Sequence, residues 1–212
     1  MVNALEEIDK LSDVKEVGKL EELARHPQIA ARPQWVTELA NSGSTSIRKA
    51  LAKNPAIASF PNVINALASD SASTVRESLA TNQTLATFPA KAVEQLAADP
   101  DPYVRQALAL NRALESFPEA VEKLSADSNY RVRANLASNP AVCVDMEIAK
   151  ALSIDEDPWV RKAFTLNPAI DPAIRTPSVT SAEADAEAET LGRQNPWQSG
   201  ISNSPSPKLS IL

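Results

Sequence analysis

The sequence predicts an all-α solenoid, a fold in which short helix pairs stack on one another. The main observation is a nine-residue motif, I-R-K-A-L-A-K-N-P from Ile47 to Pro55, which returns in related form from Val75, Val104, Val132 and Val160. The arginines of successive copies are 28, 29, 28 and 28 residues apart. A fixed period of this length is typical of solenoids, whose units bury their apolar faces by stacking on their neighbours.

Each unit is expected to contain two short helices. The first begins near a proline, which suits the first helical turn because its missing N–H has no intrahelical partner there. These prolines are Pro33, Pro61, Pro89 and Pro118. The second helix is expected to begin at Ser44, Ala72, Asp101, Asn129 or Asp157, most of them good N-cap residues. It is expected to end at Asn54, Asn82, Asn111, Asn139 or Asn167, a residue type that tolerates the left-handed conformation after a helix.

Three segments are expected along the chain. Residues 1–27 form an N-terminal helical cap in which His26 replaces the motif asparagine and caps a helix rather than catalysing. Residues 28–177 form the repeats, and residues 178–212 form a flexible tail that is first acidic and then rich in serine and proline. The tail carries two candidate peptide motifs, one around Trp197 and one at the hydrophobic C-terminus, Leu212.

Composition limits the function classes. Of 212 residues, 43% are hydrophobic and 23% charged, which is the composition of a folded protein. A net charge of −6 weighs against nucleic-acid binding, which draws on basic surfaces. The single cysteine, Cys143, lies in an apolar run and is expected to be buried; one cysteine excludes an internal disulfide. No run is apolar enough to span a membrane, and residues 1–10 lack a signal-peptide core, so we expect a cytoplasmic protein without membrane contacts.

In four units an aspartate lies six residues before the motif arginine. The pairs are Asp70 and Arg76, Asp99 and Arg105, Asp127 and Arg133, and Asp155 and Arg161, while Arg48 has Ser42 in that place. The pattern D-x4-V-R-x-x-L-A-x-N-P resembles HEAT-like repeats and, more closely, the leucine-rich-repeat-variant class, over residues 13–175. The resemblance implies a right-handed superhelix of about five to six two-helix repeats, in which aspartate and arginine columns brace adjacent units. The cysteine cluster of some variant-repeat proteins is absent here, so we expect no iron–sulfur cluster and no other cofactor.

Because every unit carries the arginine, we interpret it as serving the repeat rather than a ligand. In this interpretation each arginine is neutralised by its own unit's aspartate. The alternative is a ladder of arginines that grips phosphates or acidic ligands.

Positions that change from unit to unit carry more information about binding. On each second helix they are the residue before Ile or Val, the one after Arg and the one before Asn, which are spaced i, i+3, i+7 and share one outward face. We call these fifteen residues the variable stripe: Ser46, Lys49, Lys53, Thr74, Glu77, Thr81, Tyr103, Gln106, Leu110, Arg131, Ala134, Ser138, Trp159, Lys162 and Leu166.

The C-terminal half of the variable stripe, with its neighbour Tyr130, is the candidate binding site. Its residues are Tyr103, Gln106, Leu110, Tyr130, Arg131, Trp159, Lys162 and Leu166. Tyrosine, tryptophan and arginine are enriched in interface hot spots. In the alternative interpretation, Tyr103 and Trp159 lie flat on neighbouring loops.

These observations predict a non-enzymatic scaffold that binds another protein or peptide. With one histidine and no glycine-rich phosphate loop, no catalytic residues are assigned. The alternative is a nucleic-acid-binding solenoid resembling the HEAT-like DNA glycosylases, in which Trp159 with Asp155 or Asp157 would hold a damaged base. A chaperone-like or lyase-associated repeat protein is a third hypothesis.

Overall fold

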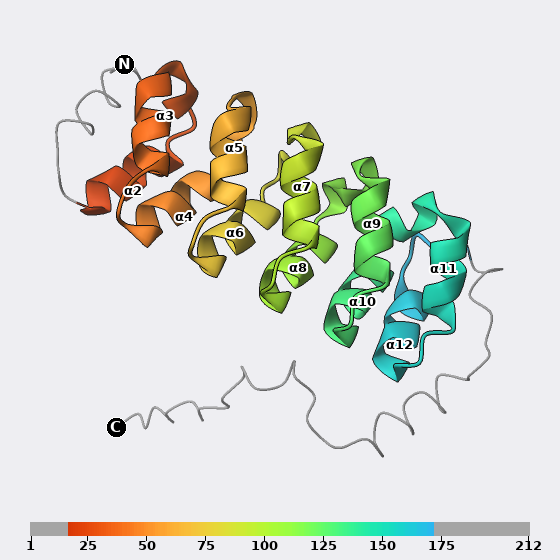
Figure 1. Cartoon of the computed structure of the whole chain (residues 1–212). Coiled ribbons are helices and arrows are strands. Elements are labelled where there is room, and N and C mark those ends of the chain that lie inside the picture. Colours follow the sequence, from red (N-terminus) through yellow and green to blue (C-terminus); the bar gives the residue numbers. More distant parts are fainter. Residues whose placement is uncertain (1–16, 172–212) are drawn as a thin grey trace, which may run out of the picture. The chain divides into compact units, whose positions relative to one another are not determined.

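The computed structural model describes residues 17–171 (Figure 1). Residues 1–16 of the predicted cap and the whole predicted tail, with Trp197 and Leu212, lie outside this range. The chain divides into two units, Met1–Ser178 and Val179–Leu212, and all the described residues belong to the first.

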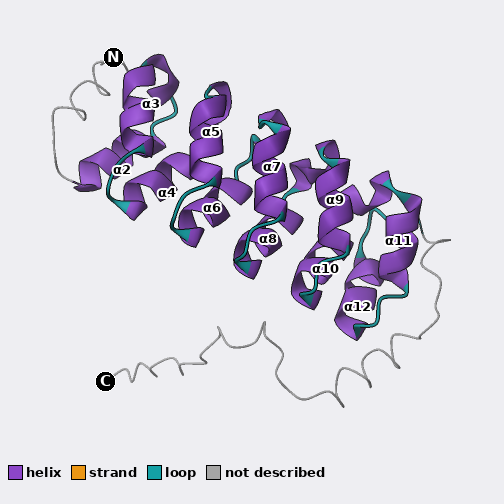
Figure 2. Ribbon diagram, in the orientation of Figure 1, coloured by secondary structure: helices purple, strands orange, loops and turns teal. Residues whose placement is uncertain are grey.

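The described residues contain helices and no strand, which confirms the all-α prediction for this part of the chain (Figure 2). The α-helices are α2 (Val17–Arg25), α3 (Pro33–Ala40), α4 (Thr45–Lys53), α5 (Pro61–Ala68), α6 (Ser73–Ala80), α7 (Ala90–Ala97), α8 (Pro102–Ala109), α9 (Pro118–Ser125), α10 (Tyr130–Ala137), α11 (Met146–Ser153) and α12 (Pro158–Leu166). Short 3-10 helices at Ile29–Ala31, Pro55–Ser59, Leu85–Thr87, Arg112–Ser116 and Pro140–Val144 lead from each even-numbered helix to the next odd-numbered one.

The helices lie in two layers (Figure 1). The even-numbered helices pack side by side in chain order in one layer, and the odd-numbered helices do so in the other. Neighbouring even-numbered helices contact each other more extensively than neighbouring odd-numbered helices do. This order of contacts is compatible with a helical repeat, and it makes the even-numbered layer the more tightly packed one.

Small residues explain the tight packing of the even-numbered layer. The motifs on α4, α6, α8 and α10 bury their Ile or Val, their Leu and the alanine after the Leu; on α8 these are Val104, Leu108 and Ala109, all without exposed surface. The alanines at this place in α4, α6 and α10 are also fully buried. Because alanine adds only a methyl group, the backbones of adjacent helices can approach closely. The buried side chains form one continuous core along the stack.

The unit of 29 residues absorbs its extra residue at the start of α7. α5 and α9 begin at Pro61 and Pro118, directly after a phenylalanine, whereas Pro89 is an N-cap and α7 begins one residue later. Phe88 accordingly has φ −75° and ψ 153°, against φ −122° and ψ 72° at Phe60. The insertion changes one loop and leaves the register of the second helices intact.

The prediction that the motif asparagines adopt a left-handed helix cap is wrong. Asn54, Asn111, Asn139 and Asn167 have extended backbones, with φ between −89° and −69° and ψ between 115° and 136°. The Nδ2 of Asn139 donates to the carbonyls of Ala109 (2.8 Å) and Asn111 (3.0 Å), both at the end of the preceding even-numbered helix. Its Oδ1 accepts from the N–H of Ala141 at 2.9 Å. An extended backbone is required because it aims the amide at the neighbouring unit.

The same bridge recurs at every motif asparagine. Asn54, Asn82, Asn111 and Asn167 each donate to two carbonyls 28 to 31 residues earlier and accept from the N–H two residues later. At the first unit His26 replaces the asparagine: its Nδ1 accepts from the N–H of Gln28 at 3.2 Å. The later motif asparagines make the same acceptor contact two residues on, and the expected cap at the end of the first helix stays a prediction.

The motif arginines bridge units in the other direction. Arg105 binds Asp127 of the following unit through Nε (2.6 Å) and Nη2 (3.0 Å), and its Nη1 donates to the main-chain carbonyl of Asp99 at 2.6 Å. The expected pairing of each arginine with its own unit's aspartate is therefore wrong: that aspartate contributes its carbonyl, and the next one contributes the carboxylate. The other pairs are Arg48 with Asp70, Arg76 with Asp99, and Arg133 with Asp155.

These ion pairs are largely shielded from water. The four arginine side chains are between 10% and 15% exposed, and their aspartates less than 10%. Each aspartate also accepts the N–H two residues later, which fixes the turn before the second helix. Arg161, in the last described unit, donates from Nη1 to the carbonyls of Asp155 (2.7 Å) and Glu156 (3.0 Å).

The bridges shift the pKa of their members. Burial alone would raise the pKa of Asp70, but hydrogen bonds from Arg48 and from a backbone N–H outweigh it and place this pKa below its usual value. The same balance lowers the pKa of Asp155, which Arg133 binds. The hydrogen bond to Asp127 raises the pKa of Arg105 above that of a free guanidinium.

A first prediction concerns the asparagine bridges. Asn82 is 1% exposed, and Asn82→Ala leaves the carbonyls of Ala52 and Asn54 without their donor, so it should lower the free energy of unfolding by about 2–4 kcal/mol. Asn111 makes the equivalent bonds but is half-buried, so Asn111→Ala should lower it by about half as much because water can reach the site. Urea unfolding measures both values. Equal losses, or a negligible loss for Asn82→Ala, would contradict the bridging role.

A second prediction concerns the ion pairs. Asp127→Asn removes the charge that compensates Arg105 and should lower the free energy of unfolding by about 3 kcal/mol or more. The matched control is the exposed pair of Lys150 and Glu147, where Glu147→Gln should change it by less than about 1 kcal/mol. Urea unfolding compares the two variants, and similar values for both would contradict the account.

A third prediction follows from the lowered pKa values. The folded-state pKa of Asp70 and Asp155 lies below that of the unfolded chain, about 3.9, so their contribution to stability is fully present above this pH. It should be lost as the pH falls through the folded-state pKa. Urea midpoints measured from pH 6 to pH 3 should therefore fall less steeply for Asp155→Asn than for the unchanged protein, and identical slopes would refute the assignment.

Candidate functional site

Exposed apolar side chains gather on the variable stripe. Among residues 17–171 the exposed large hydrophobic residues are Val17, Tyr103, Leu110, Met146, Ile154 and Leu166. Tyr103, Leu110 and Leu166 belong to the variable stripe and are 62%, 54% and 69% exposed. All three lie on or at the end of α8 and α12. They belong to the C-terminal half of the variable stripe, which the sequence predicts as the candidate binding site. The variable stripe on α4 and α6 has no exposed residue of this kind.

The helix starts hold the aromatic residues of the variable stripe in place. The side chain of Asp101 accepts from the N–H of Tyr103 at 2.9 Å, and Asp157 accepts from the N–H of Trp159 at 2.8 Å. A proline follows each aspartate as the first helical residue, so both aromatic residues occupy the second position of their helices. Residues seven positions later, Leu110 and Leu166, lie on the same face.

Trp159 and Tyr103 differ in burial. Trp159 is half-buried, and the Nζ of Lys162 lies 5.7 Å from its ring centroid, a cation–π geometry. Tyr103 is exposed, so the alternative of a tyrosine flattened on neighbouring loops does not hold for it. Gln106 and Lys162, in the middle of the variable stripe on their helices, are half-buried.

α10 lies between α8 and α12 and contributes Arg131 and two smaller residues to the variable stripe. Arg131 is exposed; its Nε donates to the Oη of Tyr130 at 3.2 Å, and its guanidinium carbon lies 5.6 Å from the Tyr130 ring centroid. Tyr130 is half-buried against the core, so its part in the candidate site is to support Arg131. Further along α10 the variable stripe continues with Ala134 and Ser138.

The charge of the variable stripe opposes that of the chain. Its fifteen residues include four basic side chains, Lys49, Lys53, Arg131 and Lys162, and one acidic side chain, Glu77. The whole chain has a net charge of −6. The variable stripe is therefore a mildly basic face on an acidic protein.

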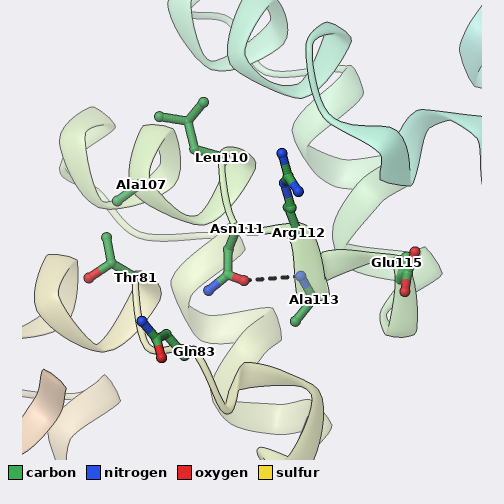
Figure 3. Close-up of a pocket in the computed structure, with 8 residues that line it drawn as sticks. All are labelled: Thr81, Gln83, Ala107, Leu110, Asn111, Arg112, Ala113 and Glu115. Carbon is green, nitrogen blue, oxygen red and sulfur yellow. Dashed lines mark hydrogen bonds between the residues drawn. The ribbon is translucent and has the colours of Figure 1, made fainter. Parts of the chain in front are cut away.

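An open pocket of about 510 Å³ continues the variable stripe at the C-terminal ends of α6 and α8 (Figure 3). Its lining residues are Thr81, Gln83, Ala107, Leu110, Asn111, Arg112, Ala113 and Glu115. Figure 3 shows the Oδ1 of Asn111 bound to the N–H of Ala113 at its centre. The sequence interpretation missed this pocket.

A signal for the pocket was nevertheless present in the sequence. Three motif copies have proline after the asparagine, Pro55, Pro140 and Pro168, whereas two adjacent copies have Gln83 and Arg112. Both of these residues line the pocket. The departure from proline in neighbouring units thus marks where the surface differs.

A second open pocket, of about 620 Å³, lies at the opposite ends of the helices. It is formed at the N-terminal ends of α8 and α10 and includes Pro102, Arg105 and Arg131. α8 therefore has an open pocket near each of its ends.

The remaining exposed hydrophobic residues have a structural explanation or lie elsewhere. Ile154 occupies the place of Ser69, whose hydroxyl accepts from Gln95 of the following unit at 3.1 Å. Ile154 lies in the last described unit, so the structure describes no following unit that could contact it as Gln95 contacts Ser69. Met146 takes the place of the proline that begins α9, and Val17 begins α2.

Cys143 is exposed, and the expectation of a buried cysteine is wrong. Its Sγ donates to the carbonyl of Ala169 at 3.3 Å, because Cys143 lies on the short 3-10 helix that follows α10 rather than inside the core. Desolvation of the sulfur raises the pKa of the thiol, which disfavours the reactive thiolate. Among the described residues, no three His, Cys, Asp or Glu side chains are grouped so as to hold a metal ion.

None of the helices between Val17 and Leu166 is both long and apolar enough to cross a membrane. No protein-family model matches the chain, and no curated protein matches it. The resemblance to HEAT-like and leucine-rich-repeat-variant proteins therefore rests on the motif residues themselves.

Proposed function

We propose that this protein is a non-enzymatic scaffold that binds another protein or peptide on the C-terminal half of the variable stripe. The observation that carries the proposal is that three of the six exposed large hydrophobic residues among residues 17–171 belong to the variable stripe on α8 and α12. Repeated residues are largely buried in bridges and core, while most residues of the variable stripe are exposed and the rest are half-buried. A surface that differs along a regular scaffold is what selective binding requires.

The proposal includes the architecture: a right-handed α-solenoid of about five to six HEAT-like or leucine-rich-repeat-variant units, with the even-numbered helices on the inner side. The recurring asparagine and arginine bridges support a repeat, and the tighter even-numbered layer supports the inner position. The handedness comes from the resemblance alone.

A binding role fits the few reactive groups better than catalysis does. The Nδ1 of His26, the single histidine, accepts from a backbone N–H, and the thiol of Cys143 has a raised pKa. We also propose a reducing cytoplasmic location, which the single cysteine supports.

Nucleic-acid binding has less support as the alternative. It requires the motif arginines to contact phosphates, yet four of them hold carboxylates with both Nε and Nη2. Only the four basic residues of the variable stripe would remain for phosphates on that face, within a protein of net charge −6.

The test compares two triple variants that each remove three exposed hydrophobic side chains. Tyr103, Leu110 and Leu166 all changed to Ser should reduce partner capture from cells of the source organism by about tenfold or more, because hot-spot residues carry most of the affinity. The measurement is quantitative mass spectrometry of proteins that co-purify with the full chain.

The matched control changes Val17, Met146 and Ile154 to Ser, which should leave capture unchanged. Thermal melting should be similar for both variants because all six side chains are exposed. Capture that survives the first variant, or fails equally in both, would reject the proposed site. Salt-sensitive binding of duplex DNA by the unchanged protein would favour the alternative instead.

A further inference from the structure

The two apolar pairs of the candidate site form parallel ridges. One ridge is Tyr103 and Leu110 at the ends of α8, and the other is Trp159 and Leu166 at the ends of α12. Seven residues separate the members of each pair, which is about 10 Å along a helix. Each ridge therefore runs along its helix for most of the helix length.

α10 lies between the ridges, and we call the strip of surface over α10 the trough. α8 and α12 each pack directly against α10. With about 8–10 Å between packed helix axes, the ridges are about 16–20 Å apart. The residues of the variable stripe on α10 after Arg131 are Ala134 and Ser138, which are too short to fill this space.

The width of the trough selects the backbone of its occupant. An α-helix with its side chains is about 10–12 Å across, so when it lies along α10 it leaves about 2–5 Å to the axis of either ridge, a gap that the leucine and aromatic side chains of the ridges can fill. An extended peptide is about 5 Å wide between strand axes and would contact one ridge at a time. A helix that presents apolar residues at i, i+3, i+4 and i+7 buries them against both ridges.

The charge of this surface indicates which charged side chains the occupant carries. The nine residues of the variable stripe on α8, α10 and α12 include Arg131 and Lys162 and no acidic residue. Both cations are held over aromatic rings, at 5.6 Å and 5.7 Å from the centroids, so little side-chain freedom is lost when they bind a carboxylate. The complementary surface is acidic.

We propose that the partner segment is an acidic amphipathic α-helix that lies along α10 between the two ridges. Its apolar face contacts Leu110 and Leu166, and its carboxylates meet Arg131 and Lys162. The inference rests on the proposed function, since it names the kind of partner that the same face binds.

The test uses the full chain and three fluorescent peptides of about 18 residues, or ~27 Å of helix. The first has leucine on one helical face and glutamate on the other, the second has lysine for every glutamate, and the third has two central prolines in the acidic sequence. Fluorescence anisotropy should show the first binding about tenfold or more tightly than the other two, and less tightly as the salt rises from about 50 to 200 mM. Equal binding of the proline peptide, or no binding of the acidic helix, would overturn the inference.

Two variants test the position of the helix. Ser138→Leu fills the trough between Leu110 and Leu166, so it should weaken binding of the acidic helix by about tenfold. If the face were only a hydrophobic patch, the added leucine would strengthen binding, and that result would contradict the inference. Arg131→Glu should weaken binding by a similar factor, while Lys123→Glu, on the exposed surface of α9, should leave it unchanged.

Other occupants give different results. A peptide of residues 179–212, which is acidic between Glu183 and Glu189, would identify the chain's own tail as the occupant if it displaced the acidic helix at equal concentration. Self-association that Ser138→Leu abolishes would identify a second copy of the chain. Either result would overturn the claim of a separate partner. If the acidic helix fails to bind while the Ser variant of Tyr103, Leu110 and Leu166 still loses its cellular partner, the inference fails and the proposed function stands.

Discussion

The described structure depends on side chains that complete the hydrogen bonding of a neighbouring unit. Arg105 holds the carboxylate of Asp127 in one neighbouring unit, and Asn139 holds two main-chain carbonyls of another. Because these groups are largely withdrawn from water, a missing partner would leave a buried charge or a buried carbonyl unsatisfied. Each unit is therefore fixed in register against the next by specific contacts as well as by the shared apolar core.

A fixed register turns sequence variation into surface variation. The motif residues recur from unit to unit, so the variable stripe occupies the same place on α4, α6, α8, α10 and α12 while its chemistry changes from Lys49 and Lys53 to Leu110 and Leu166. The insertion beside Pro89 is absorbed in a loop and leaves this correspondence intact. The proposed function assigns binding to the residues that differ, which here are the exposed apolar and basic residues of α8, α10 and α12.

The period, the prolines and the apolar spacing were sufficient to predict the helices, their buried faces and most of the exposed residues of the variable stripe, because these follow from local patterns. The bridges between units were harder to predict from the sequence. Arg105 lies six residues after Asp99 and 22 residues before Asp127. Only the packing of units decides which of the two carboxylates the guanidinium reaches. Asn139 likewise has its backbone set by carbonyls 28 and 30 residues away, which no local rule contains. The pocket beside Leu110 depends on two adjacent units together, so a pattern read within one motif copy did not reveal it.

The central claim is that the repeated residues build the scaffold and the variable residues bind. Saturation mutagenesis of the full chain, with cellular abundance and partner binding measured for every variant, tests this claim most directly. Substitutions at Arg105, Asp127 and Asn139 should lower abundance and binding together, whereas substitutions at Tyr103, Leu110 and Leu166 should lower binding at normal abundance. If the variable positions tolerate all substitutions in both measurements, or the bridging positions tolerate them in abundance, the claim is wrong.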